Sequence, residues 1–442
     1  MSSVTAREIN KVFYTTPRDG YKSGNIWIKR KEEELFETFL DGIGISICID
    51  GPTGTGKSSL AITVLKKKKI DFILIQVTKN MSWKQFCIKL FQSHSGDANT
   101  FDFGVDAGIE KGLPIFKFHL GYKVDSDPEK NIDYENKLIE RMNDHEICAI
   151  LKKQNITLVI DDFERASDEI ISNVGEMCKL LTLSYIANRA KLVIIGTDDI
   201  YRRLTSFNKS LEGRLKEVSL GTIDKKDESW RFLNDGFNKL NLKHPSFEYQ
   251  NKIGSISIDD IKECKECCYD AADGLLKALN ELGAEIAVNA TINNRISKAT
   301  INTVCKKYLE RNSKRFTQNY PLISQVVQKN AVAKRLVVYL YNKGIGRIHK
   351  WDDIIDNLDE INEISQIENA IIELVQIDFL TRTGYNGEIL FVTNPTLAHT
   401  IGAVINNPNK YKIPKALVIS PNQYVLPFLE RLENDNSLPE VS

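Results

Sequence analysis

The 442-residue sequence has no run of apolar residues that approaches the length needed to cross a membrane. A membrane-spanning helix takes about 18 or more such residues. The first residues, MSSVTAREINKVF, also lack the basic and then apolar profile of a secretory signal. The sequence therefore predicts a cytoplasmic protein without a membrane partner, and its length favours two or three domains.

Disulfide bonds and a zinc centre are also disfavoured. The eight cysteines have no framework spacing, which is typical of thiols in a reducing compartment. Only Cys264, Cys267 and Cys268 lie close together, and no second Cys or His pair nearby completes the four ligands that zinc needs. We therefore expect a helix that carries three thiols. Nothing resembles a nuclease or protease site, and the absence of an N-K-x-D motif leaves guanine specificity unsupported.

The net charge is zero, but the charges are unevenly placed. Residues 295–350 hold thirteen Lys/Arg and one acidic residue, a net charge of +12, whereas residues 351–442 have a net charge of −9. This asymmetry favours a surface for an anionic partner. The alternative is that the two regions neutralise each other within the fold.

A phosphate-binding loop is the strongest motif. The sequence GPTGTGKS fits G-x-x-x-x-G-K-[ST] and lies between an apolar strand at 45–49 and a helical pattern. Backbone N–H groups of such a loop bind phosphate oxygens, together with the positive end of the helix. Lys57 is expected at the β- and γ-phosphates and Ser58 on Mg²⁺, which predicts ATP and Mg²⁺ as cofactors. The predicted nucleotide-binding residues are Gly51, Pro52, Thr53, Gly54, Thr55, Gly56, Lys57, Ser58 and Ser59.

A second strand supplies acidic residues. In ITLVIDDFERAS, Asp161 is the first acid after the apolar run 156–160 and is predicted to hold the metal ion. Many hydrolysing P-loop enzymes place Glu next to polarise water, whereas this chain has Asp162, with Glu164 as a second candidate base. This pair favours slow, gated hydrolysis of ATP.

Further apolar strands at 71–78 and 191–197, with a helical pattern between 167 and 190, predict an α/β fold with a doubly wound parallel sheet. Thr197 then ends its strand beside the γ-phosphate. The 104 residues from Lys57 to Asp161 leave room for an insertion at about 95–130. Its segment 101–126 predicts a β-hairpin. This hairpin either contacts DNA or a protein partner, or is a surface feature without a binding role.

These motifs resemble the AAA+ and STAND ATPases, near the replication-initiator and transposon-helper branch. IWIKRKEEELFETFL is similar to the N-terminal box of that group and places Arg30 near the adenine. Thr197 matches sensor 1, and SLEGRLKEVSL offers Arg214 as an arginine finger for a neighbouring subunit. AADGLLKALNELGAEIA is similar to the lid helix, with Lys277 at sensor 2. The resemblance implies a homo-oligomer, and the doubled aspartates are commoner in STAND switches.

The carboxyl third predicts a winged helix. Helical patterns at 331–344, 351–358 and 363–380 precede two strands around Asn386 and Gly387, a hairpin-turn signal. The expected domains are the ATPase at 1–223, a helical lid at 224–325, the winged helix at 326–405 and a tail at 406–442. The third helix does not suit DNA, because it carries Glu363, Glu368 and Glu373. Sequence-independent nucleic-acid contact would instead use Lys306, Lys307, Arg311, Lys314 and Arg315; otherwise the helix binds a basic protein surface.

Two functions follow from these features. The first is an ATPase switch that oligomerises on nucleic acid or a protein partner and acts through an effector protein, as similar proteins in mobile elements and phage defence do. The alternative is a DNA-bound initiator or target-selection ATPase that recruits another enzyme. A small-molecule kinase is disfavoured, because such enzymes seldom carry a lid and a winged helix.

Overall fold

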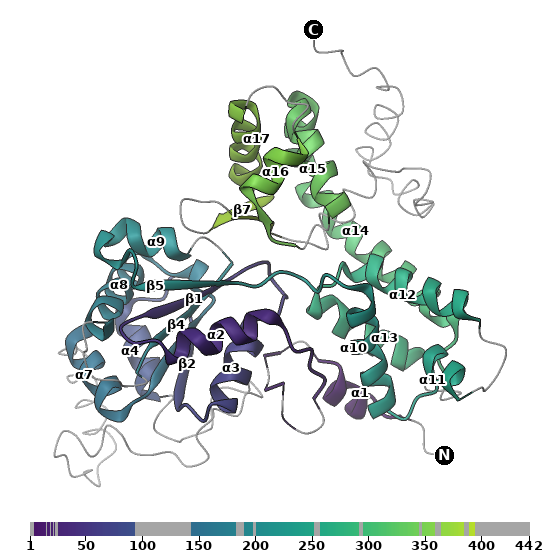
Figure 1. The fold of residues 1–442 in the computed structure, drawn as a ribbon, viewed down its shortest axis with the longest axis horizontal. Helices are drawn as coiled ribbons and strands as arrows, with labels where there is room; N and C mark the ends of the chain where they lie inside the picture. The colour runs from purple at the N-terminus through teal and green to yellow at the C-terminus, as the bar shows by residue number, and fades with distance from the viewer. Residues whose placement is uncertain are drawn as a thin grey trace.

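The computed structural model describes residues 4–92, 143–182, 190–197, 200–251, 257–290, 295–343, 347–358, 364–383 and 389–393, except 15, 18, 21, 23 and 24. These residues form a sheet unit, a helical unit and a C-terminal unit (Figure 1). Within the described ranges no helix is long and apolar enough to cross a membrane. The predicted hairpin at 101–126, the turn at Asn386 and the tail at 406–442 lie outside these residues.

The sheet unit contains a five-stranded parallel sheet in the order β2-β3-β4-β1-β5. Its strands are β1 (Ser46–Asp50), β2 (Phe72–Gln76), β3 (Thr157–Asp161), β4 (Leu192–Ile195) and β5 (Leu215–Ser219). Every residue of β1, β3 and β4 is buried, because helices cover both faces of the sheet. The predicted doubly wound parallel sheet is confirmed. The strand β5 was not predicted, since its segment was assigned only to the arginine finger.

Two hydrophobic cores lie on opposite faces of this sheet. One face packs against α2 and α3, and the other packs against four helices. The helices of the sheet unit are α2 (Lys31–Asp41), α3 (Lys57–Lys67), α4 (Trp83–Gln92), α7 (Asp144–Gln154), α8 (Asp168–Thr182) and α9 (Ile200–Phe207). Because the strands are parallel, their carboxyl ends meet at one edge, where both the phosphate loop and the acidic residues begin.

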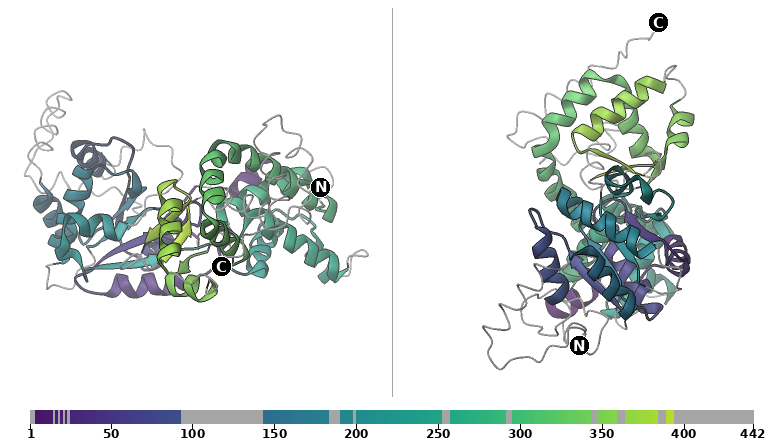
Figure 2. Two further views of the ribbon diagram at one scale, coloured as in Figure 1. Left: turned by 90° about the horizontal axis from the view of Figure 1, so that it is seen from above. Right: turned by 90° about the vertical axis from the view of Figure 1, so that its left-hand side faces the viewer.

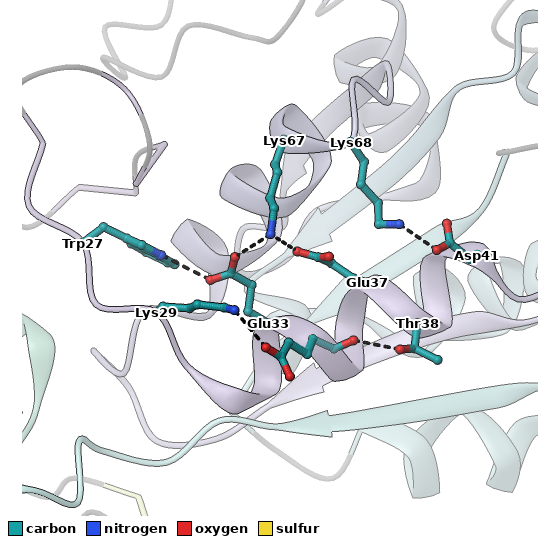
Figure 3. Close-up of polar contacts among 9 residues, drawn as sticks. Trp27, Lys29, Glu33, Glu37, Thr38, Asp41, Lys67 and Lys68 are labelled. Atoms are coloured by element: carbon teal, nitrogen blue, oxygen red, sulfur yellow. Dashed lines mark hydrogen bonds and ion pairs between the residues drawn. The ribbon is translucent and has the colours of Figure 1, made fainter.

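The first covering layer is fixed by ion pairs between α2 and α3 (Figure 3). Glu33 is fully buried and accepts hydrogen bonds from Trp27 Nε1 and Lys67 Nζ, each at 3.2 Å. Lys67 also pairs with Glu37, and Lys68 pairs with Asp41 at 2.7 Å. Both lysines lie at the carboxyl end of α3, where positive charge stabilises a helix. The far end of the phosphate-loop helix is therefore held to α2.

The helical unit packs around its own apolar core. Its helices are α1 (Ala6–Val12), α10 (Lys226–Lys239), α11 (Pro245–Gln250), α12 (Ile258–Ala272), α13 (Leu276–Ala290) and the first part of α14 (Lys298–Lys329). The short helix α1 was not predicted, and the ring of Phe13 after it packs on Gly236 and Gly283.

The predicted helix with three thiols is α12. Burial raises the pKa of Cys264 to about 12, and Cys268 lies 3.9 Å from Cys305 of α14. Cys264 and Cys268 belong to the apolar core of the helical unit, and Cys267 packs against it. In the ranges that the structure describes, no group of three or more ligating side chains is arranged to hold a metal ion.

The C-terminal unit joins three helices to a three-stranded antiparallel sheet in the order β6-β8-β7. Its elements are α15 (Ala331–Lys343), β6 (His349–Lys350), α16 (Trp351–Asn357), α17 (Ile364–Gln376), β7 (Leu380–Thr383) and β8 (Ile389–Val392). The three predicted helices are present, but the third ends at Gln376 and not at 380, where β7 begins. The two-residue strand β6 was not predicted. Seen from above, this unit lies over the boundary between the sheet unit and the helical unit (Figure 2).

Candidate nucleotide-binding site

The loop between β1 and α3 is shaped by left-handed glycines. Gly56 is the N-cap of α3 with φ +96°, and Gly54 has φ +86°. A Cβ atom at Gly56 would lie 2.9 Å from Leu276, and one at Gly54 would lie 2.9 Å from Lys277. Both neighbours come from the start of α13, so the helical unit packs directly on the loop. Larger residues would break this contact and the loop conformation together.

Lys57 is the buried cation of the loop, with 8% of its surface exposed. Its Nζ donates hydrogen bonds to the carbonyls of Gly51 at 2.8 Å and Pro52 at 3.0 Å. Burial lowers the pKa of Lys57, while Glu164 and Asp161 favour its charged form. Phosphate oxygens are stronger acceptors than these carbonyls, so the lysine is placed to exchange its loop contacts for a phosphate.

Ser58 and Asp161 form the candidate magnesium site. The Ser58 hydroxyl donates a hydrogen bond of 2.6 Å to Asp161 Oδ2, and Asp161 Oδ1 accepts one of 2.9 Å from Asp162 N. Burial raises the pKa of Asp161, and the bond from Ser58 opposes this effect. One hydroxyl and one carboxylate fit Mg²⁺, which takes few protein ligands and completes its octahedron with water and phosphate oxygens.

The two candidate bases occupy different surroundings. Asp162 has a left-handed backbone with φ +56°, and its Oδ2 accepts a 2.8 Å hydrogen bond from Gln76 Nε2 at the end of β2. Glu164 Oε2 accepts a 3.2 Å bond from the backbone N–H of Thr197, just after β4. Burial raises the pKa of Glu164. Its carboxylate favours the charged form of Lys57 more than Asp161 or Asp162 does. Asp162 therefore faces β2, whereas Glu164 lies on the side of Thr197 and Lys57.

Arg30 is buried beneath the loop. Its guanidinium donates to the carbonyls of Thr55 at 3.2 Å, Gly221 at 2.6 Å and Thr222 at 3.2 Å. Burial lowers the pKa of Arg30, and Glu32 at 3.5 Å favours the charge. The described contacts of Arg30 are thus with the loop and with the segment after β5.

Lys277 of the helical unit contacts the carboxyl edge of the sheet, and Arg214 lies at the opposite edge. The Lys277 N–H donates to the Gly54 carbonyl at 3.0 Å, and its exposed side chain runs along Gly54. Arg214 precedes β5 at the amino end of the sheet, where its carbonyl accepts from Ser46 N and its guanidinium reaches Thr182 Oγ1 at 3.5 Å. The structure therefore brings Lys277 to the loop but not Arg214.

Sequence reasoning missed Gln76 and Leu276. Gln76 is the only polar residue of FILIQ and ends a strand beside the acidic one, which is the signal that marks it. Leu276 gave no signal, since an apolar residue at the start of a helix is ordinary.

The parallel sheet with its glycine loop and acidic strand defines a P-loop α/β protein. Residues 44–204, which include the loop and both candidate bases, match the family model described as AAA domain. No curated protein matches the chain. Together, the sheet and the family match support a P-loop domain of the AAA+ fold.

Solved structures include similar folds. The Walker-type ATPase of Pyrococcus abyssi is 17% identical with a TM-score of 0.51, over 88% of this chain and 99% of that one. The ADP form of the Aeropyrum pernix ORC2 protein is 11% identical with a TM-score of 0.42, over 94% and 100%. The RuvB Holliday junction branch migration motor of Thermotoga maritima is 10% identical with a TM-score of 0.36, over 83% and 92%. The first of these similarities shows the fold.

Proposed function

We propose that the chain binds ATP with Mg²⁺ at this loop and hydrolyses it slowly. The observation that carries the proposal is the 2.6 Å bond between Ser58 and Asp161 directly beside the buried Lys57. Lys57 binds the β- and γ-phosphates, and Ser58 and Asp161 hold Mg²⁺. The bound Mg²⁺ supplies positive charge that neutralises the phosphate oxygens. The match of residues 44–204 to the AAA domain supports this function.

The proposal includes gating of the hydrolytic step. The Gln76 amide binds Asp162 Oδ2 and holds the carboxylate toward β2, so we propose that the carboxylate turns toward the phosphate loop before it takes a proton from water. Glu164 is held by the backbone N–H of Thr197 instead, and burial disfavours its charged form, which raises its pKa. Either route makes hydrolysis slow until the site rearranges. Thr197, bonded to Glu164 through its N–H, is the proposed sensor of the γ-phosphate.

Titration with ATP tests the function. Wild type should bind ATP more tightly with Mg²⁺ than without it, and Lys57→Ala should lose binding because the loop loses its buried cation. Lys66→Ala, a cation of the same helix α3, serves as the matched control and should bind as wild type does. Asp161→Asn should keep part of the ATP affinity and lose the Mg²⁺ effect. Unchanged affinity in Lys57→Ala would refute the proposed site.

The helical unit fits the proposed lid, because α13 begins on the loop and carries Lys277 as sensor 2. Arg214 lies far from its own loop, which fits an arginine finger that acts on a neighbouring subunit. We therefore propose a homo-oligomer of the STAND or initiator type, in which ATP controls assembly and recruits an effector protein.

For the C-terminal unit we propose a winged helix. The order α15-β6-α16-α17-β7-β8 with the sheet order β6-β8-β7 supports this assignment. The helix α17 exposes Ile364 and Ile372 at 56% and 44%, and its Glu368 carboxylate lies 3.5 Å from Arg382. Exposed apolar groups beside an acid suit a protein partner better than a phosphate backbone.

Nucleic acid is the second candidate partner, through the basic face of α14. Lys306 and Lys307 are exposed there. Arg311 is already engaged by Glu285 at 2.6 Å and by the ring of Tyr308, which weakens its assignment to phosphate binding. The side chains of Lys314 and Arg315 lie outside the described part of α14. This face supports the alternative function, a DNA-bound initiator or target-selection ATPase.

A further inference from the structure

The residues that follow β5 contact both the phosphate loop and the N-terminal segment. We call Leu220–Asp224 the junction segment. Its first residue, Leu220, donates through its N–H to Asp50 O at 2.8 Å, and the Leu220 carbonyl packs against Gly51. Arg30 binds the next two carbonyls of the segment. Residues 220–223 are buried, so a displacement of the loop backbone displaces them as well.

The same segment contacts the helical unit. Ile223 N–H donates to the Gly274 carbonyl at 2.9 Å, in the turn between α12 and α13. Tyr269 OH of α12 donates to the Asp224 carbonyl at 3.3 Å. The turn at Gly274 is followed directly by the residues of α13 that rest on the loop. The junction segment therefore shares its contacts between the loop and the proposed lid.

The C-terminal unit contacts the junction segment through Arg347. Arg347, just before β6, donates to the Asp224 carbonyl at 2.9 Å, and its Nε lies 3.2 Å from the Asp224 carboxylate. Burial raises the pKa of the Tyr269 hydroxyl, and Arg347 beside it opposes this effect. Arg347, Asp224 and Tyr269 thus belong to three different parts of the chain and meet at one point.

A second attachment holds the C-terminal unit to the sheet unit. Its strand β7 lies against α9 (Figure 1). The helix α9 is tied to the acidic turn, because Arg203 donates to the carbonyls of Phe163 at 3.1 Å and Ala166 at 3.2 Å, on either side of Glu164. By contrast, α14 packs against helices of both the helical unit and the C-terminal unit. A movement of the lid relative to the sheet must therefore change the contacts of the C-terminal unit.

We propose that Arg347 is a positioning residue that couples occupancy of the nucleotide site to the orientation of the C-terminal unit. This inference rests on the proposed nucleotide binding. When phosphates replace the Gly51 and Pro52 carbonyls as partners of Lys57, the loop backbone and the start of α13 shift. The shift passes through the junction segment to Asp224, and Arg347 transmits it to β6. Because coupling is reciprocal, loss of Arg347 also changes the affinity for ATP.

Hydrogen exchange and ATP titration together test the coupling. In wild type, ATP with Mg²⁺ should change exchange in the loop and also in β6, β7 and α9. In Arg347→Ala the loop should still respond, but the response of the C-terminal unit should become smaller, most of all in β6, which follows Arg347 directly. The ATP affinity should change by about 1.4- to 5-fold, the range of a solvent-exposed ion pair. This change should shrink between low and high salt, since the Asp224 and Arg347 side chains are 58% and 37% exposed.

Matched variants separate the coupling from general damage. Lys343→Ala removes an exposed cation of α15 in the same unit and should keep both responses. Arg347→Lys should restore part of the response. Asp224→Asn keeps the backbone carbonyl that Arg347 binds, so it should remove the salt dependence but only part of the response. A wild type in which ATP protects the loop but never alters β6, β7 or α9 overturns the coupling alone. A wild type in which ATP leaves the loop unprotected overturns both the coupling and the proposed function.

Discussion

The side-chain amide of Gln76 donates a 2.8 Å hydrogen bond to the carboxylate of Asp162, from the last residue of β2 to the residue after β3. The two strands are adjacent, with Gln76 opposite Asp161 in the parallel register. The amide therefore holds the residue that follows the proposed metal ligand. This contact gives the clearest route to deciding which acid activates water.

If Asp162 is the base, Gln76→Leu should increase hydrolysis, because it frees the carboxylate without adding a charge. Asp162→Asn should then slow hydrolysis by about 10²–10⁴-fold while ATP still binds, as loss of a general base does. Glu164→Gln should be mild. Single-turnover rates at saturating ATP and Mg²⁺ measure these effects. The opposite ranking of the two acid variants would transfer the role to Glu164.

The raised pKa of Glu164 predicts a pH-dependent stability. A folded-state pKa above the unfolded value means that the folded protein binds the proton more tightly, so stability falls as pH rises from the ordinary pKa of a glutamate through the folded pKa. Glu164→Gln removes this loss and keeps an acceptor for Thr197 N–H. We expect its melting temperature to exceed that of wild type at pH 7.5. The difference should vanish near pH 4; an equal difference at both values would contradict the assignment.

Arg30→Ala should destabilise the protein by about 2–4 kcal/mol, since it leaves three carbonyls without their charged donor. Arg30→Lys should recover only part of this, because a single ammonium cannot reproduce the planar fork. Lys29→Ala, which removes only an exposed pair with Glu34, is the control. Denaturant unfolding measures the free energies. A variant Arg30→Ala as stable as Lys29→Ala would show that the buried contacts contribute nothing.

Arg214→Ala should bind ATP normally and hydrolyse it poorly if the arginine serves a neighbouring subunit. Mixing this variant with Lys57→Ala should restore part of the activity, because mixed interfaces then pair an intact loop with an intact arginine. Activity of wild type should rise more than linearly with protein concentration. Full activity of Arg214→Ala alone, with a linear dependence in wild type, would place catalysis within one subunit.

Charge reversal of Lys306 and Lys307 tests nucleic-acid binding. The log of duplex affinity falls with log salt by about 0.9 per neutralised phosphate, so the double variant should lower this slope and weaken every sequence alike. Glu368→Gln should leave the sequence preference unchanged, because DNA phosphates repel this acid and keep it away from the bases. If wild type does not bind duplex DNA at low salt, the nucleic-acid hypothesis fails, and the basic face of α14 is better explained as a protein-binding surface.

The strands that are buried on both faces could be predicted from the sequence, because they are continuous runs of apolar residues. The continuous apolar runs of β1, β3 and β4 follow from a sheet covered on both faces. The edge strand β5, with the sequence LKEVS, is only partly buried. Lys216 and Glu217 interrupt its apolar pattern, so the sequence did not predict a strand there. The loop and Asp161 follow from local motifs. The contacts of Gln76, Arg30 and Arg347 arise only from tertiary packing between distant segments, which local patterns do not encode.

The single helix α14 extends through 32 residues from the helical unit into the C-terminal unit. At 1.5 Å per residue its length is about 48 Å. It therefore acts as a lever: a rotation of about 10° at its first turn displaces its last turn by roughly 8 Å. Small rearrangements over the phosphate loop, too slight to alter the sheet, thus become movements at α17 as large as the spacing between packed helices.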